Sequence, residues 1–198
     1  ITPSTGVFGA AIAAGLLLKM DEEQLAMAMG LAGTQSFGLR EMFGTMTKPF
    51  HPGKAAQNGL MAALLVQKGF TSSTQVLEAE RGFFNVYSPK HNVFKVLEDF
   101  GEVWELEKNA FKPYACGIVL HPSIDACIQL SEVALPEEVD KIILQVNPYV
   151  LELTGKKEPK TGLEGKFSIY HTGAMAFLER DASEDQYQDE KVLASKTI

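Results

Sequence analysis

The chain has 198 residues, of which 45% are hydrophobic and 22% charged, as in globular proteins with one domain or two small ones. Its formal net charge of -7, with no dense run of Lys and Arg, argues against a nucleic-acid-binding protein. The two cysteines, Cys116 and Cys127, are too few for a disulfide framework or a zinc ligand set. They favour a reducing compartment, so we expect a cytoplasmic protein, or a mitochondrial matrix protein if the source is eukaryotic.

The first part of the chain predicts closely packed helices. Val7–Met20 is rich in Ala and Gly and is apolar nearly all round, which predicts a helix buried between other helices. The apolar run over 6–18 is too short to span a bilayer and has no basic lead-in, so neither a transmembrane helix nor a signal peptide is predicted. Asp21 is the expected N-cap of the next helix, and Leu25 lies on the predicted inner face of that helix.

The stretch Phe43–Phe70 joins a polar cluster to a predicted helix. Lys48 and His51 are expected in a turn that two prolines and a glycine punctuate, with the helix beginning at Lys54. Gly69 is the expected stop of this helix. Small residues that allow a second helix to approach closely form one stripe of it: Ala55, Gly59, Ala62, Ala63 and Val66.

Lys48 and His51 have two interpretations. In the functional one, they stand at the start of a buried helix, where unpaired backbone N–H groups favour an anionic substrate. In the simpler one, they belong to an ordinary surface loop before a core helix, where an isolated lysine is solvated. This stretch alone favours the simpler interpretation.

Short helices are predicted towards the end of this helical half. Thr74–Glu80 is one, and Val93–Phe100, stopped by Gly101, is another. Between them, Arg81–Asn92 is aromatic and irregular, a pattern typical of a segment that packs over the edge of a core.

The pattern changes after residue 101. The imperfect alternation over Val103–Phe111 predicts a strand, Pro122–Val133 predicts a helix, and the alternation over 142–146 predicts a second strand with one buried face. A strand, a helix and a strand after an all-helical half predict a second domain of α/β type. We therefore expect part of a large helical domain over 1–101 and part of a smaller α/β domain over 102–198.

The last part of the chain predicts a loop, a helix and an acidic tail. The loop over 155–165 contains glycine and lysine residues. Lys166–Leu178 follows as a helix with Phe177 buried. Glu179–Asp189 is acidic and is predicted to be exposed.

Two further polar groupings resemble the one at Lys48. Lys112 and Tyr114 occupy a turn, and His121 stands at the start of the helix that follows; Lys166 and Tyr170 are four residues apart on one predicted helix and share a face. Lysine can hold a carboxylate as a point charge or act as a base, and tyrosine can donate a proton. The simpler alternatives are a core tyrosine with a satisfied hydroxyl and a histidine that merely begins a helix.

Common catalytic motifs are absent from the sequence. No GxGxxG, Walker loop, HExxH, CxxC or GxSxG occurs, which argues against the usual nucleotide-binding, zinc-protease and serine-hydrolase classes. The four histidines are widely separated, and no spacing between them supports a metal site. We expect neither a metal nor a cofactor.

Five stretches, in this order and with this spacing, together resemble the MmgE/PrpD family, which includes 2-methylcitrate dehydratase, cis-aconitate decarboxylase and iminodisuccinate epimerase. They are TGVFGAAIAAGLLL, TKPFHPGKAAQNGLMAALLVQKGFT, LEAERGFF, FKPYACGIVLHPSIDA and KFSIYHTGAMAFL. The resemblance implies a large all-helical domain, a smaller α/β lid domain and an active site in the cleft between them. It also implies cofactor-independent chemistry on small polycarboxylates, usually in a homodimer, with no membrane or nucleic-acid partner.

The resemblance also implies roles for individual residues. Lys48 of TKPFHPG and Lys112 of FKPYACG are similar to the active-site lysines of the family, and they are expected to face one cleft. Tyr170 of KFSIY is the third expected catalytic residue, and His51 and His121 are expected to line the substrate pocket. The long N-terminal segment of the family, which supplies an acidic residue and histidines, and its closing C-terminal helices have no counterpart here, so we expect a fragment of a longer chain.

Two classes of function follow. The first is a cofactor-independent lyase, similar to 2-methylcitrate dehydratase, that removes a proton next to a carboxylate of a di- or tricarboxylate with loss of water. A decarboxylase of the cis-aconitate type and an epimerase of the iminodisuccinate type share the same lysine framework and remain alternatives. The second class is a catalytically incomplete helical fragment or interaction module that keeps the core of the family without its site.

Overall fold

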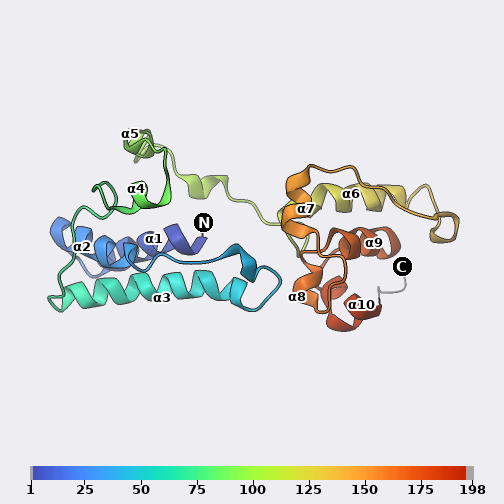
Figure 1. The fold of residues 1–198 in the computed structure, drawn as a ribbon, viewed down its shortest axis with the longest axis horizontal. Helices are drawn as coiled ribbons and strands as arrows, with labels where there is room; N and C mark the ends of the chain where they lie inside the picture. Colours follow the sequence, from blue (N-terminus) through green and yellow to red (C-terminus); the bar gives the residue numbers. More distant parts are fainter. Residues whose placement is uncertain (1, 195–198) are drawn as a thin grey trace. The chain divides into compact units, whose positions relative to one another are not determined.

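The computed structural model describes residues 2–194. Over that range the fold is mostly α, with ten α-helices and five short 3₁₀-helices (Figure 1). The mostly helical class predicted from the sequence is therefore confirmed. The chain forms two compact units: unit 1 comprises residues 1–41 and 47–108, and unit 2 comprises 42–46 and 109–198. Within the described range, no helix combines the length and the hydropathy needed to cross a bilayer.

Three long helices build unit 1: α1 (Thr2–Leu17), α2 (Glu22–Gly33) and α3 (Thr47–Gln67). Helix α1 runs along α3, and α2 packs against both (Figure 1). The core between them consists of mostly small apolar side chains, among them Val7, Phe8, Ala11, Ala28, Ala32, Ala55 and Ala62. The helices can approach closely because these side chains are small.

The predicted small-residue stripe of α3 is confirmed as its buried face. All five stripe residues are buried, whereas the neighbouring Leu60, Leu64 and Leu65 are 37–49% exposed. A Cβ atom at Gly59 would lie 2.5 Å from the Cβ of Ala10 and 2.6 Å from the backbone nitrogen of Ala11. Glycine at this position is therefore required for the contact between α1 and α3.

Two predicted helix boundaries are confirmed by their hydrogen bonds. The carboxylate of Asp21 accepts from the N–H of Gln24 at 2.9 Å, and the side-chain oxygen of Gln24 accepts from the N–H of Asp21, which forms a capping box at the start of α2. Gly69 follows α3 with φ +90°, and the N–H of Phe70 donates to the carbonyl of Leu65 at 3.1 Å. This bond is the signature of a Schellman motif, which requires the left-handed residue that glycine supplies.

The start of α3 corrects a prediction. Lys48 and His51 do not lie in a turn before the helix; they lie within its first two turns, because α3 begins at Thr47. Pro49 is compatible with this start, since the first N–H groups of a helix have no partner within the helix. Pro52 lies further in, and it leaves the carbonyl of Lys48 without its usual donor four residues on.

The rest of unit 1 contains short elements: α4 (Phe83–Tyr87), α5 (Val93–Leu97) and the 3₁₀-helix η2 (Glu105–Lys108). The predicted helix over Thr74–Glu80 is wrong, because that segment is a series of turns. Two of its carbonyls accept from residues seven positions on: that of Val76 from the N–H of Phe83 at 2.7 Å, and that of Leu77 from the N–H of Phe84 at 3.1 Å. A helix instead needs each carbonyl to accept from the N–H four residues on, as Gln75 does from Ala79 at 3.1 Å.

Unit 2 is built on the contact between α6 (His121–Leu130) and α9 (Ile169–Glu179). Its core includes Leu120, Ile124, Cys127, Ala176 and Phe177. The shorter elements around this pair are η3 (Ile118–Leu120), η4 (Pro136–Glu138), α7 (Pro148–Thr154), α8 (Gly162–Gly165), η5 (Glu184–Tyr187) and α10 (Asp189–Ala194).

The predicted strands, and with them the α/β character of the second domain, are not confirmed. Val103–Phe111 is exposed throughout and contains η2, so its apolar residues do not form a buried face. Residues 141–147 have no regular secondary structure, but their alternation is as predicted: Ile142, Leu144 and Val146 pack against the core, while the residues between them are exposed. A strand also needs a hydrogen-bonded partner, and within 2–194 the only β-type pairing is an isolated bridge between Gly155 and Ser168.

The predicted helix over Lys166–Leu178 begins three residues later than expected. Ser168 is the N-cap of α9, because its hydroxyl accepts from the N–H of His171 at 3.2 Å. Lys166 is instead the C-cap of the preceding helix α8. Lys166 and Tyr170 are therefore not an i, i+4 pair on one helix, as was predicted.

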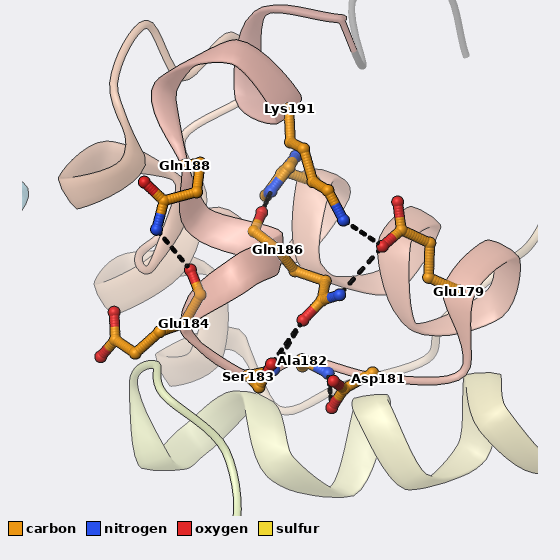
Figure 2. Close-up of polar contacts among 9 residues, drawn as sticks. Glu179, Asp181, Ala182, Ser183, Glu184, Gln186, Gln188 and Lys191 are labelled. Atoms are coloured by element: carbon orange, nitrogen blue, oxygen red, sulfur yellow. Dashed lines mark hydrogen bonds and ion pairs between the residues drawn. The ribbon is translucent and has the colours of Figure 1, made fainter.

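The acidic segment 179–189 is only partly exposed, which corrects another expectation. Figure 2 shows the side chain of Gln186, which is 5% exposed, at the centre of a polar network. Its amide nitrogen donates to the carboxylate of Glu179 at 2.9 Å, and its amide oxygen accepts from the backbone and the hydroxyl of Ser183, both at 2.9 Å. Lys191 donates to the same carboxylate of Glu179. These bonds hold the segment against the end of α9.

Candidate functional site

Lys112 and His121 meet at the backbone carbonyl of Cys116. The ammonium of Lys112 donates to this carbonyl at 3.3 Å. The pKa of His121 is lowered from its ordinary value of 6.5, mainly by burial and then by the positive charge of Lys112; the carboxylate of Asp125 and a hydrogen bond to the Cys116 carbonyl oppose this shift. The structure therefore brings together two of the residues that the sequence singled out.

The imidazole of His121 has one unused nitrogen. Its Nε2 atom is buried and has no hydrogen-bond partner among the described residues. A neutral imidazole carries its proton on one nitrogen and a lone pair that can accept a hydrogen bond on the other. A buried polar atom without a partner costs about 1–3 kcal/mol, so a hydrogen bond to Nε2 would offset that cost.

Tyr114 and Asp125 complete this cluster. The phenol of Tyr114 donates to Asp125 Oδ1 at 2.5 Å, and this bond is the main cause that raises the pKa of Tyr114 to about 12. The ring of Tyr114 meets that of His121 edge-on, with centroids 5.3 Å apart and planes at 89°. Sequence reasoning missed Asp125, although its position four residues after His121 on the predicted helix was a usable signal.

The two cysteines are not nucleophiles in this structure. Cys116 is 6% exposed and Cys127 is fully buried, and burial raises the pKa of both thiols. A thiol reacts as its thiolate, which a raised pKa disfavours at neutral pH. The carbonyl of Cys116, rather than its sulfur, is therefore the group that organises the cluster.

Among the described residues, the side chains of Tyr170 and Lys166 make no hydrogen bond to the side chains of this cluster. Tyr170 is 46% exposed on α9, and within the described residues its hydroxyl bonds neither Lys112 nor His121. The ammonium of Lys166 is occupied by both carboxylate oxygens of Glu184, at 2.7 and 2.9 Å. Unlike Lys112, Lys166 is therefore held in an ion pair.

Lys48 and His51 belong to unit 1. Lys48 is exposed in the first turn of α3, and His51, one turn later, is 8% exposed with its ring edge-on to Phe37 at 5.8 Å between centroids. Lys48 and Lys112 lie in separate units. That they face one cleft stays a prediction.

A cavity of about 430 Å³ lies elsewhere in unit 1. Its polar lining includes Thr34, Ser73, Gln75 and Arg81, and its apolar lining includes Phe83. None of the five predicted site residues lines it. The residues that line this cavity are therefore different from those that the sequence singled out as site residues.

Comparison with known families accounts for nearly the whole chain. The MmgE/PrpD N-terminal domain matches residues 1–94, and the MmgE/PrpD C-terminal domain matches residues 114–198. The chain belongs to the MmgE/PrpD family. Lys48 falls within the first matched range and His121 and Tyr170 within the second, whereas Lys112 lies in the stretch between the two.

Relatives of this MmgE/PrpD chain include cis-aconitate decarboxylases. The enzyme of Aspergillus terreus is 33% identical over 131 residues, which cover 61% of this chain and 27% of the relative. The human enzyme is 27% identical over 184 residues (88% and 37%), and that of Mus musculus is 25% identical over 204 residues (94% and 40%). The chain thus spans only a quarter to two fifths of the length of these curated relatives.

Proposed function

We propose that this MmgE/PrpD chain is part of a cofactor-independent lyase that acts on a small di- or tricarboxylate. Family membership and the named relatives support a lyase. The observation that carries the proposal is the meeting of Lys112 and His121 at the carbonyl of Cys116. This places a cation beside a neutral imidazole that has an unused nitrogen.

The negative net charge of the protein gives Lys112 a role in binding an anionic substrate. A chain with a net charge of -7 repels polycarboxylates, so binding one requires a local positive charge. Lys112 is exposed, and within residues 2–194 its only hydrogen-bond partner is a neutral carbonyl, so no carboxylate there neutralises its charge as Glu184 neutralises that of Lys166. Lysine binds a carboxylate as a point charge, which is the role we propose for Lys112.

The proposed chemistry needs both charge and proton transfer. Decarboxylation breaks the bond between a carbon and its carboxylate, releases CO₂ and leaves an electron pair on the carbon framework, which takes up a proton. Dehydration removes a proton next to a carboxylate and expels a hydroxyl group as water. We assign the charge to Lys48 and Lys112, the proton donor to Tyr170, and substrate binding to His51 and His121.

Decarboxylation of a cis-aconitate-like tricarboxylate is the first candidate, because the relatives named above are cis-aconitate decarboxylases. Dehydration of 2-methylcitrate, which the sequence analysis placed first, is the second, and epimerisation of iminodisuccinate is the third. Both rest on the resemblance of the lysine segments alone. The homodimer stays a prediction.

Turnover by the purified full-length protein tests the proposal. Proton NMR in deuterated buffer would follow cis-aconitate, 2-methylcitrate and iminodisuccinate, and we expect loss of CO₂ from cis-aconitate. Lys112→Ala should lower turnover at least about a hundredfold, the usual cost of losing a group that stabilises developing charge. Lys108→Ala is the matched control, since Lys108 is an exposed lysine four residues earlier that pairs only with Glu105.

The results for the variant and for the three acids distinguish the candidate functions. Unchanged turnover in Lys112→Ala would remove Lys112 from the site. Conversion of 2-methylcitrate instead of cis-aconitate would select the dehydratase. Neither product nor deuterium uptake with any of the three acids would favour the non-catalytic interaction module.

A further inference from the structure

We propose that Tyr114 and Asp125 are a positioning pair that fixes the ring of His121, whose buried Nε2 atom has no hydrogen-bond partner among the described residues. This inference rests on the proposed function and adds two residues to that site. The pair is joined by the hydrogen bond from the Tyr114 phenol to Asp125 Oδ1, and the ring of Tyr114 lies edge-on against the imidazole.

The positions of the three residues explain how the pair acts. His121 is the first residue of α6 and Asp125 is four residues later, so both lie on one face of the helix. Tyr114 comes from the segment before η3, and it spans the two: its ring packs on His121, and its hydroxyl bonds Asp125. The ring of His121 is thus restrained by the ring of Tyr114, which the bond to Asp125 holds in place.

This restraint is needed because an imidazole can turn about its side-chain bonds. Such a rotation would carry Nε2 away from the direction in which a substrate would meet it. The contact with the Tyr114 ring limits that rotation, and the bond to Asp125 keeps Tyr114 in place. A misplacement of about 1 Å at such a group can cost a hundredfold in rate.

The pair also controls which charges face His121. The groups around the imidazole are the ammonium of Lys112, the carboxylate of Asp125, the thiol of Cys116 and the phenol of Tyr114. Lys112 disfavours an imidazolium and Asp125 favours one. Because Asp125 accepts the proton of a neutral phenol, its carboxylate is held on Tyr114 and does not turn to pair with His121.

Two conservative variants should therefore move the pKa of His121 in opposite directions. In Tyr114→Phe the ring remains but Asp125 is released, so its carboxylate can stabilise the imidazolium, and the pKa of His121 should rise. In Asp125→Asn the anion is lost while an oxygen that can accept from Tyr114 remains, so the pKa of His121 should fall. A pair that only braced the fold would lower stability in both variants, and the pKa of His121 would not rise in Tyr114→Phe.

NMR titration of the imidazole protons in the full-length protein measures these shifts, with His121 assigned by comparison with His121→Gln. We expect the two opposite shifts, and in Tyr114→Phe also a lower kcat with the acid limb of its pH profile moved to higher pH. Tyr87→Phe is the control, because Tyr87 is an exposed tyrosine of unit 1 whose hydroxyl bonds the carbonyl of Ser36. An unchanged pKa of His121 in both variants, or a shift in the same direction in both, overturns the proposal.

The titration separates this inference from the proposed function, because it requires no turnover. Opposite shifts without activity on any acid would keep the positioning pair and remove the lyase. Activity without the shifts would keep the lyase and remove the pair. If Tyr114→Phe does not fold, an unchanged or raised pKa of His121 in Asp125→Asn still overturns the proposal.

Discussion

The chain contains two segments in which a lysine and a proline precede an aromatic residue, and they fold differently. Lys48-Pro49-Phe50 lies in the first turn of α3, whereas Lys112-Pro113-Tyr114 is irregular. Both lysines are exposed, and both segments precede a histidine that the sequence singled out. The same local pattern thus presents a lysine from a helix in one unit and from a loop in the other.

The difference arises from what each segment contacts. The first segment is continued by Ala55 and Gly59, which dock on α1 and stabilise a helix that extends back over the prolines. The second segment uses its backbone donors at long range: the N–H of Ala115 bonds the carbonyl of Ala182 at 3.0 Å, and that of Gly117 bonds Lys166 at 3.1 Å. Donors committed to distant partners cannot form a helical ladder.

The largest effect that would sharpen this comparison is expected at Gly59. Gly59→Ala should lower the free energy of unfolding of unit 1 by about 3 kcal/mol, because the new Cβ atom would meet backbone atoms of α1. Gly53→Ala is the matched control in the same helix, where a Cβ atom would meet nothing within 4 Å. It should raise stability by about 0.5–1 kcal/mol, as alanine for glycine does in an open helix. Urea unfolding measures both.

If Gly59→Ala were as stable as the unchanged protein, the close packing of α1 against α3 would not explain why the first segment is helical. The contrast between the two segments would then need a local explanation.

The next effect concerns pH and unit 2. Burial lowers the pKa of His121 and of His171 below 6.5. The unfolded chain therefore binds protons that the folded chain does not as pH falls below about 6.5, and the stability of unit 2 should decrease there by at most about 1.4 kcal/mol per pH unit for each histidine. Above that pH the contribution is fully present.

Urea unfolding at pH 7.5 and 5.5, followed through amide exchange in each unit, measures this loss. His121→Gln should abolish the part of this stability loss that comes from protonation of His121, the histidine beside the Lys112 segment. A stability of unit 2 that rises as pH falls across this range would contradict the prediction.

The smallest effect is expected at the prolines. Pro52→Ala restores an N–H that can donate to the carbonyl of Lys48 within α3, so it should raise stability by about 1 kcal/mol. Pro113→Ala restores no helical bond and loosens the unfolded chain, so it should lower stability by about 0.5–1 kcal/mol. Melting temperatures would show the opposite signs; equal signs would mean that the two segments respond alike and would weaken the comparison.

The sequence by itself determined the features that depend on neighbouring residues. The cap at Asp21, the stop at Gly69 and the buried stripe of α3 were all predicted, because caps and helical periodicity are local properties. The alternation over 142–146 also predicted which side chains face the core. The motif-bearing stretches indicated the family, and with it Lys112 and His121.

Only the tertiary structure decided which segments pair and which side chains of the candidate site contact one another. It showed that residues 141–147 lack the partner that would make them a strand, since pairing depends on a segment far away in the chain. It placed Lys112 and His121 on one carbonyl and revealed the bond between Tyr114 and Asp125. These contacts join residues from separate elements, and their hydrogen bonds form only once η3, α6 and the segment before them are folded together.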